Sequence, residues 1–197
     1  IQAKSAGFCF GVDRAVKMAQ ELAATAQRPC MLGTVIHNSR VVDELTNQGM
    51  RVIRSPEETS AGDSVLLRAH GEGKWVYDVL AARGAHVIDA TCPKVARVHK
   101  LVEDAQREGR QPVVIGEANH PEVRGIGGWC ENLLVFSGPE EVEEWVKTTA
   151  DVSDMAITVV SQTTLIRWVW EKSLEILKKE CTNLKIFDTI CSATHMR

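Results

Sequence analysis

Several features of specialised proteins are missing from this 197-residue sequence. No apolar run reaches the roughly 20 residues that a membrane-spanning helix needs, and the opening residues lack the layout of a signal peptide. Positive charge is not in excess, since 23 Lys and Arg stand against 26 Asp and Glu. Whole-surface binding to nucleic acid or to an anionic membrane is therefore not expected. These absences predict a soluble, cytoplasmic protein that binds neither nucleic acid nor membrane.

A Cys-x-x-Cys pair is also missing, although the chain has six cysteines. Its absence argues against a zinc ribbon and against a thioredoxin-type redox motif. Hydrophobic residues make up 44% of the chain and charged residues 25%, which is ordinary for a globular protein. Six cysteines are many for a reducing compartment, so some of them need another role.

An internal repeat places two of these cysteines at equivalent positions. When Cys9 is aligned with Cys92, two segments match without a gap. In each segment a glycine follows the cysteine after 24 residues and a histidine follows it after 28. The glycines are Gly33 and Gly116, and the histidines are His37 and His120.

Each repeated segment begins as a one-sided helix and continues into a short apolar strand. Apolar residues recur at three-and-four spacing within residues 12–23 and 95–105, as in amphipathic helices. The strands expected over 29–32 and 111–115 do not alternate, which suits a parallel sheet buried on both faces. We therefore expect an α/β fold of pseudo-symmetric units, each a short parallel sheet flanked by helices.

The second half of each unit repeats as well. Strands that begin at Ser64 and Ala156 each deliver a polar residue before a helix, and each unit then ends in Asp-x-x-Cys. Residues 1–10 are expected to form an opening strand with the first cysteine, residues 11–92 the first unit, and residues 93–188 the second. Residues 189–197 would begin a truncated third unit.

Ligands of open α/β sheets bind beyond the carboxyl ends of the strands. The cysteines, histidines and threonine that follow the expected strands should therefore lie in one ligand-binding region. Three cysteines gathered at one site could bind zinc, form one disulfide, or hold an iron–sulfur cluster with an open iron position. We expect the cysteines of the repeat to ligate a metal and the other three to be buried structural thiols. The first set is Cys9, Cys92 and Cys191, and the second is Cys30, Cys130 and Cys181.

Three histidines and one carboxylate suggest phosphate binding and proton transfer. His37, His70 and His120 stand at equivalent strand ends, where imidazoles can donate hydrogen bonds to a phosphate. Glu122 could relay a proton to a ligand held near His120. The alternative for Glu122 is a solvated carboxylate in the first turn of a helix.

Weaker signals come from hydroxyls, glycines and the remaining histidines. Thr163 could orient a substrate oxygen, and Thr164 is expected to cap a helix that starts at Leu165. The glycines at 125, 127 and 128 suggest either close backbone approach or a phosphate-facing loop. Ordinary core or surface roles are expected for His86, His99 and His195.

The sequence resembles the 4-hydroxy-3-methylbut-2-enyl diphosphate reductase family, also called LytB. The matching motifs span nearly the whole chain in the family's order. They are GFCFGVDRA from Gly7, IHN from Ile36, RAHG from Arg68, DATCP from Asp89, HPEV from His120, QTT from Gln162 and DTICSAT from Asp188.

The resemblance implies a trefoil of three α/β units around a 4Fe-4S cluster, with Cys9, Cys92 and Cys191 as its ligands. It implies reduction of an allylic diphosphate substrate to isopentenyl and dimethylallyl diphosphates, with ferredoxin or flavodoxin as electron donor. The family continues into a third unit that completes the diphosphate site, and this chain departs from the family there.

The resemblance also assigns the polar site residues. His37, His70 and His120 would bind the diphosphate. Glu122 and Thr163 would bind the departing hydroxyl and help to protonate it.

Two other functions fit parts of the pattern. A non-catalytic module of two units would bind a cluster or a diphosphate without turnover. A zinc hydrolase or deaminase would use the same cysteines with a metal-bound water, although the Pro-Cys-x-x-Cys half of the deaminase signature is absent. Motif content favours the reductase.

Overall fold

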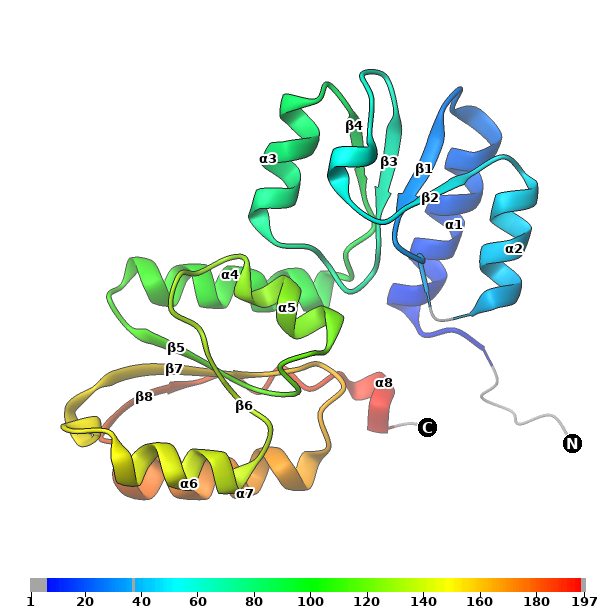
Figure 1. Cartoon of the computed structure of the whole chain (residues 1–197). Helices are drawn as coiled ribbons and strands as arrows, with labels where there is room; N and C mark the ends of the chain where they lie inside the picture. Colours follow the sequence, from blue (N-terminus) through cyan, green and yellow to red (C-terminus); the bar gives the residue numbers. More distant parts are fainter. Residues whose placement is uncertain (1–6, 37, 196–197) are drawn as a thin grey trace, which may run out of the picture. The chain divides into compact units, whose positions relative to one another are not determined.

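The structure is a computed structural model that describes residues 7–36 and 38–195. The chain divides into two compact units between Val95 and Ala96, inside helix α4 (Pro93–Arg107). Each unit is a layered α/β structure with one sheet between helices (Figure 1). No helix among the described residues is both long and apolar enough to cross a membrane.

The first unit contains a sheet of four parallel strands. Its elements are α1 (Phe10–Thr25), β1 (Pro29–Leu32), α2 (Ser39–Asn47), β2 (Arg51–Ile53), the 3-10 helix η1 (Pro56–Glu58), β3 (Ser64–Leu67), α3 (Lys74–Ala82) and β4 (His86–Asp89). The strand order is β2-β1-β3-β4. Side chains of α1 and α2 pack on one face of the sheet and those of α3 on the other.

The second unit contains another sheet of four parallel strands. Its elements after α4 are β5 (Gln111–Ile115), α5 (Pro121–Gly127), β6 (Leu134–Phe136), α6 (Pro139–Thr148), η2 (Val152–Asp154), β7 (Ala156–Ser161), α7 (Arg167–Glu180), β8 (Asn183–Ile186) and α8 (Ser192–His195). The strand order is β6-β5-β7-β8. Helices α4 and α5 cover one face, and α6 and α7 cover the other (Figure 1).

The two sheets have the same topology, and their strand-ending glycines are equivalent. The amide of Gly33 donates to the carbonyl of Ile53, and the amide of Gly116 donates to that of Phe136, each at 2.8 Å. The strands expected over 29–32 and 111–115 have those bounds as β1 and β5. The predicted α/β fold with two repeated units is confirmed.

The central strands are buried because helices cover both of their faces. All four residues of β1 are buried, as are the last four of β5 and the last five of β7. The apolar stripe predicted for the first helix faces this core, with Val16, Ala19 and Leu22 buried. A strand enclosed on both faces has no solvent side that would require alternate polar residues.

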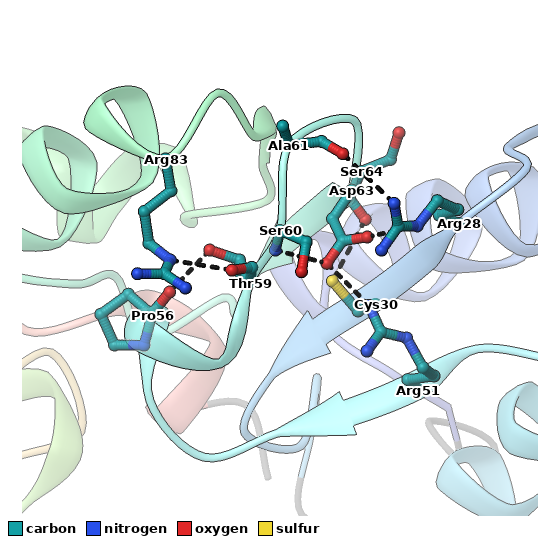
Figure 2. A network of polar contacts seen from close by, with 10 residues as sticks. All are labelled: Arg28, Cys30, Arg51, Pro56, Thr59, Ser60, Ala61, Asp63, Ser64 and Arg83. Carbon is teal, nitrogen blue, oxygen red and sulfur yellow. Dashed lines mark hydrogen bonds and ion pairs between the residues drawn. The ribbon is translucent and has the colours of Figure 1, made fainter.

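A buried carboxylate fixes the amino ends of three strands in the first unit (Figure 2). The Asp63 side chain is fully buried and forms ion pairs with Arg28 at 2.8 Å and with Arg51 at 2.7 Å. It also accepts a hydrogen bond from the amide of Ser60 at 2.9 Å. Burial alone would raise the pKa of Asp63, but these partners outweigh burial and lower its pKa. The network lies at the end of the sheet opposite to the strand ends that carry the predicted site residues.

Candidate functional site

Two predicted site residues of the second unit form a buried pair. Glu122 lies in the first turn of α5, and Thr163 follows β7. The amide of Thr163 donates to Glu122 Oε1 and its hydroxyl donates to Oε2, both at 2.6 Å. The exposed fractions are 1% for Glu122 and 5% for Thr163. The alternative of a solvated carboxylate at Glu122 is therefore wrong.

The environment of this pair favours a protonated carboxyl. Burial raises the pKa of Glu122 and outweighs the opposite effect of the two Thr163 hydrogen bonds and of nearby His120. A carboxyl with a raised pKa keeps its proton to a higher pH than an ordinary glutamate does. Glu122 and Thr163 can therefore pass a proton to a group bound beside them.

His120 directly precedes α5. It is the N-cap of the helix, and its Nδ1 accepts a hydrogen bond from the amide of Glu122 at 3.1 Å. Because Nδ1 acts as an acceptor, the neutral ring carries its proton on Nε2. The half-buried imidazole thus has a donor suited to an anionic oxygen, and the same hydrogen bond connects it to Glu122.

Gln162 holds together the two loops that carry this pair. Its Oε1 accepts from the amide of Glu117 at 3.0 Å, and its Nε2 donates to the Thr164 hydroxyl at 2.7 Å. A Cβ atom at Gly116 would lie 2.8 Å from Gln162 Cβ, so only glycine fits beneath this side chain. The amide of Gln162 is therefore engaged in positioning the loops.

Two minor predictions for this unit are wrong. Helix α7 begins at Arg167 after the N-cap Ile166, which makes no side-chain cap, so Thr164 does not cap it. The glycine cluster does not form a loop, because α5 continues from Pro121 through Gly127 and Gly128 is its C-cap at φ −77°. Helical backbone at these positions leaves no nest of amides for a phosphate.

His70 lines a small pocket in the first unit. The residue follows β3, is half-buried, and stands in a turn in which the amide of Gly71 donates to the carbonyl of Arg68 at 3.1 Å. The pocket has a volume of about 260 Å³. Its polar side chains are His70 and Asn38, and its other walls are Phe8, Val12, Val35, Ile36 and Ala69.

This pocket contains residues that the sequence reasoning did not flag. Asn38 is the N-cap of α2, and its side chain accepts from the amide of Val41 at 3.4 Å. The sequence feature that could have identified Asn38 is the Ile-His-Asn motif that begins at Ile36. His37, which was flagged, lies outside the described residues, and so does most of the expected opening strand, residues 1–6.

The structure brings Cys92 to the start of the helix that follows Cys9. Cys9 is the N-cap of α1, and its side chain makes no cap hydrogen bond. A Cβ atom at Gly11, in the first turn of α1, would lie 2.6 Å from Cys92 Sγ. Cys92 itself directly precedes α4. Both thiols therefore stand at the positive ends of helices.

The six cysteines divide by environment only in part as the sequence suggests. All are free thiols; Cys9, Cys92 and Cys191 are half-buried and Cys30 and Cys181 are buried, but Cys130, which was expected to be buried, is half-buried as well. Burial raises the pKa of Cys30 and of Cys130 to about 11, so the surroundings of these two thiols do not activate them as thiolates.

The residues present fit a thiolate-bound cluster in their chemistry. Cys9 and Cys92 belong to the first unit and Cys191 to the second. Within 7–36 and 38–195, no group of three or more His, Cys, Asp or Glu residues could hold a metal ion. Two observations make these residues chemically suitable for a cluster. The three thiols are free and half-buried at helix starts, and Gly11 leaves room for the thiol of Cys92.

Among the remaining histidines, His99 has a core role and His86 is exposed. His99 is 3% exposed and stacks on Trp129, with ring centroids 5.1 Å apart. His86 opens β4 at the surface. The side chain of His195 is outside the part of the chain whose side chains are described.

The fold and these sites define a repeated α/β protein with a buried carboxyl–hydroxyl pair and three cysteines at helix starts. The whole chain, residues 1–197, matches the LytB protein family. The chain belongs to that family.

Curated relatives are named as 4-hydroxy-3-methylbut-2-enyl diphosphate reductases. The protein from Caldanaerobacter subterraneus subsp. tengcongensis is 41% identical over 203 residues, which cover 99% of this chain and 67% of the relative. That from Nitratidesulfovibrio vulgaris is 36% identical, covering 100% of this chain and 71% of the relative. The chain thus spans about two thirds of the length of such relatives.

Solved structures show the same similarity in three dimensions. One is described as (E)-4-hydroxy-3-methyl-but-2-enyl diphosphate reductase, the terminal enzyme of the non-mevalonate pathway; it is 37% identical, with a TM-score of 0.86 over 100% of this chain and 69% of that chain. The corresponding reductase from Plasmodium falciparum is 25% identical, with a TM-score of 0.89 over 98% of this chain and 60% of that chain.

Proposed function

We propose that this protein is an iron–sulfur reductase that converts 4-hydroxy-3-methylbut-2-enyl diphosphate to isopentenyl and dimethylallyl diphosphates. The main support is the buried Glu122–Thr163 pair in a member of the LytB family. Such a pair suits protonation of a leaving hydroxyl, which is what the proposed reaction needs.

Binding of the substrate is assigned to residues at the strand ends. His37, His70 and His120 hold the diphosphate by donating hydrogen bonds to its oxygens. The Nε2 proton implied for neutral His120 supports this role. The apolar pocket beside His70 suits the hydrocarbon part of a small allylic ligand.

Glu122 and Thr163 carry the proton chemistry. Removal of the hydroxyl as water requires one proton, and addition of hydrogen to the allylic carbon requires a second, balanced by two electrons. The Thr163 hydroxyl orients the substrate oxygen, and Glu122 supplies the proton through or beside it. The raised pKa of Glu122 supports this assignment, because the acid form persists to a higher pH.

Cys9, Cys92 and Cys191 are the proposed ligands of a 4Fe-4S cluster. When bound, such a cluster supplies single electrons and a Lewis-acidic iron with an open position. The proposed electron donor is ferredoxin or flavodoxin. We propose a cytoplasmic location, where free thiols such as these stay reduced.

Anaerobic turnover tests this function directly. The protein is purified without oxygen, reconstituted with iron and sulfide, reduced chemically, and given the diphosphate substrate. Release of both product diphosphates would support the reductase. Iron and substrate binding without products would instead support a non-catalytic module. Zinc near one equivalent with no visible absorption would support a hydrolase.

A further inference from the structure

The two Asp-x-x-Cys segments have the same hydrogen-bonded turn in both units. The segments are Asp89–Cys92, after β4, and Asp188–Cys191, after β8. The two occurrences lie in different units and are 99 residues apart in the chain. A geometry that recurs at equivalent places in two sheets points to a shared purpose.

In the first unit the aspartate connects the turn to a helix. Asp89 Oδ1 accepts from the amide of Thr91 at 2.8 Å, and Oδ2 accepts from the Tyr77 hydroxyl of α3 at 2.9 Å. The Cys92 amide donates to the carbonyl of Ala69 at 3.0 Å. Side chain and backbone thus fix the turn that ends at the cysteine.

The second unit repeats each of these contacts. Asp188 Oδ1 accepts from the amide of Ile190 at 3.2 Å, and Oδ2 forms an ion pair with Arg167 of α7. The Cys191 amide donates to the carbonyl of Thr163 at 2.7 Å. Helix α7 occupies in this unit the place of α3 in the first.

A further arginine anchors the first turn from a third element. Arg14 of α1 donates to the carbonyl of Thr91 at 3.1 Å and to that of Asp89 at 3.4 Å. Since α1 begins after Cys9, the same helix supports both cysteines of the first unit.

We propose that Asp89 and Asp188 are positioning residues, which hold Cys92 and Cys191 in place for ligation. Each aspartate uses one oxygen to close its turn and the other to tie the turn to a helix. This inference rests on the proposed function, because it assigns the purpose of the turns to holding a cluster.

Site-specific thiol alkylation of iron-free, reduced protein tests the proposal with an internal control. Asp89→Ala loses two hydrogen bonds and should speed alkylation of Cys92 at least about fivefold, which is the factor expected for one typical hydrogen bond, and leave Cys191 unchanged. Asp188→Ala should do the reverse. Asp89→Asn keeps one acceptor oxygen, which can still close the turn through the Thr91 amide, and should bring the alkylation rate of Cys92 closer to the wild-type rate than Asp89→Ala does. Peptide mass spectrometry measures each cysteine in the same sample.

Tyr77→Phe provides a milder variant, should Asp89→Ala fold poorly. It removes only the hydroxyl that reaches Asp89 and should raise alkylation of Cys92 alone. Equal changes at Cys92 and Cys191 in every variant, or no change at either, would overturn the proposal.

The alkylation experiment can fail independently of the proposed function. Wild-type protein that takes up no iron would contradict the cluster, whereas the alkylation pattern would still decide whether the aspartates hold the cysteines. Wild-type protein that takes up iron, together with unaltered alkylation in Asp89→Ala and Asp188→Ala, would contradict only the positioning role.

Discussion

Gly11→Ala should reduce iron binding to less than half of the wild-type value while leaving the protein folded. Gly11 lies in the first turn of α1 with no side chain between that helix and Cys92. A Cβ atom there would lie 2.6 Å from Cys92 Sγ and 3.1 Å from Cys92 Cβ. Well-packed carbon atoms sit about 3.5–4.0 Å apart, so the thiol must move by about 1 Å or rotate away.

Two opposing effects set the stability of this variant. Overpacking costs about 1–3 kcal/mol, and the gain in helix propensity from glycine to alanine is at most about 1 kcal/mol. The expected net loss is about 0–2 kcal/mol, which urea unfolding can measure. A displaced thiol should nevertheless lower the iron content after anaerobic reconstitution to less than half of the wild-type value.

Gly127→Ala is the matched control for this experiment. It also adds a methyl group to a helical glycine, but the nearest atom is 3.7 Å away, so iron content should stay at the wild-type value and stability should be unchanged or up to about 1 kcal/mol higher. Gly11→Ala protein that keeps its full iron content would refute the placement of Cys92 as a ligand. Loss of iron in both variants would show that the effect is not specific to the thiol.

Three further perturbations test other parts of the account. Glu122→Gln should keep the cluster and lose turnover by about 100-fold or more, as for the loss of a general acid; unchanged turnover would remove Glu122 from the mechanism. The lowered pKa of Asp63 contributes stability that is complete above its ordinary value of 3.8 and is lost as the pH falls through the folded value. Asp63→Asn should therefore flatten the melting temperature against pH below about pH 4, and parallel curves for variant and wild type would contradict this. Gly116→Ala places a Cβ atom 2.8 Å from Gln162 Cβ and should cost about 1–3 kcal/mol in urea unfolding; wild-type stability would argue against the close packing.

The repeat and the strands could be predicted because they depend on local pattern. A run such as Gln111–Ile115 is short, apolar and unalternating, and a parallel sheet buried on both faces is the structure that suits it. The equal offsets from each cysteine to a glycine revealed the two units, because equivalent strand ends use glycine in the same place. Neither the apolar runs nor the cysteine-to-glycine offsets predict the order of the strands in each sheet.

Burial of polar groups was the part that sequence did not predict. Glu122 looks like an ordinary first-turn carboxylate, and only the return of β7 beside β5 brings Thr163 over it. Asp63 stands in a turn-like segment, yet it is fully buried because Arg28 and Arg51 reach it from two other strand starts. Such contacts join residues that are distant in the chain, so local periodicity in the sequence cannot predict them.

Thr164 shows the same limit at a helix start. A threonine before an apolar residue is a good N-cap by composition, but its hydroxyl is already held by the Gln162 amide. The chain therefore continues to Ile166 before α7 begins.

The most direct test of the central claim is the iron and acid-labile sulfide content of anaerobically reconstituted protein, measured with its visible spectrum. We expect about four irons and four sulfides per chain and a broad absorption near 400 nm, as for thiolate-bound 4Fe-4S clusters. The triple variant with serine at Cys9, Cys92 and Cys191 should bind none. Wild-type protein without iron after reconstitution, or a triple variant with undiminished iron, would contradict the claim that these three cysteines hold a cluster.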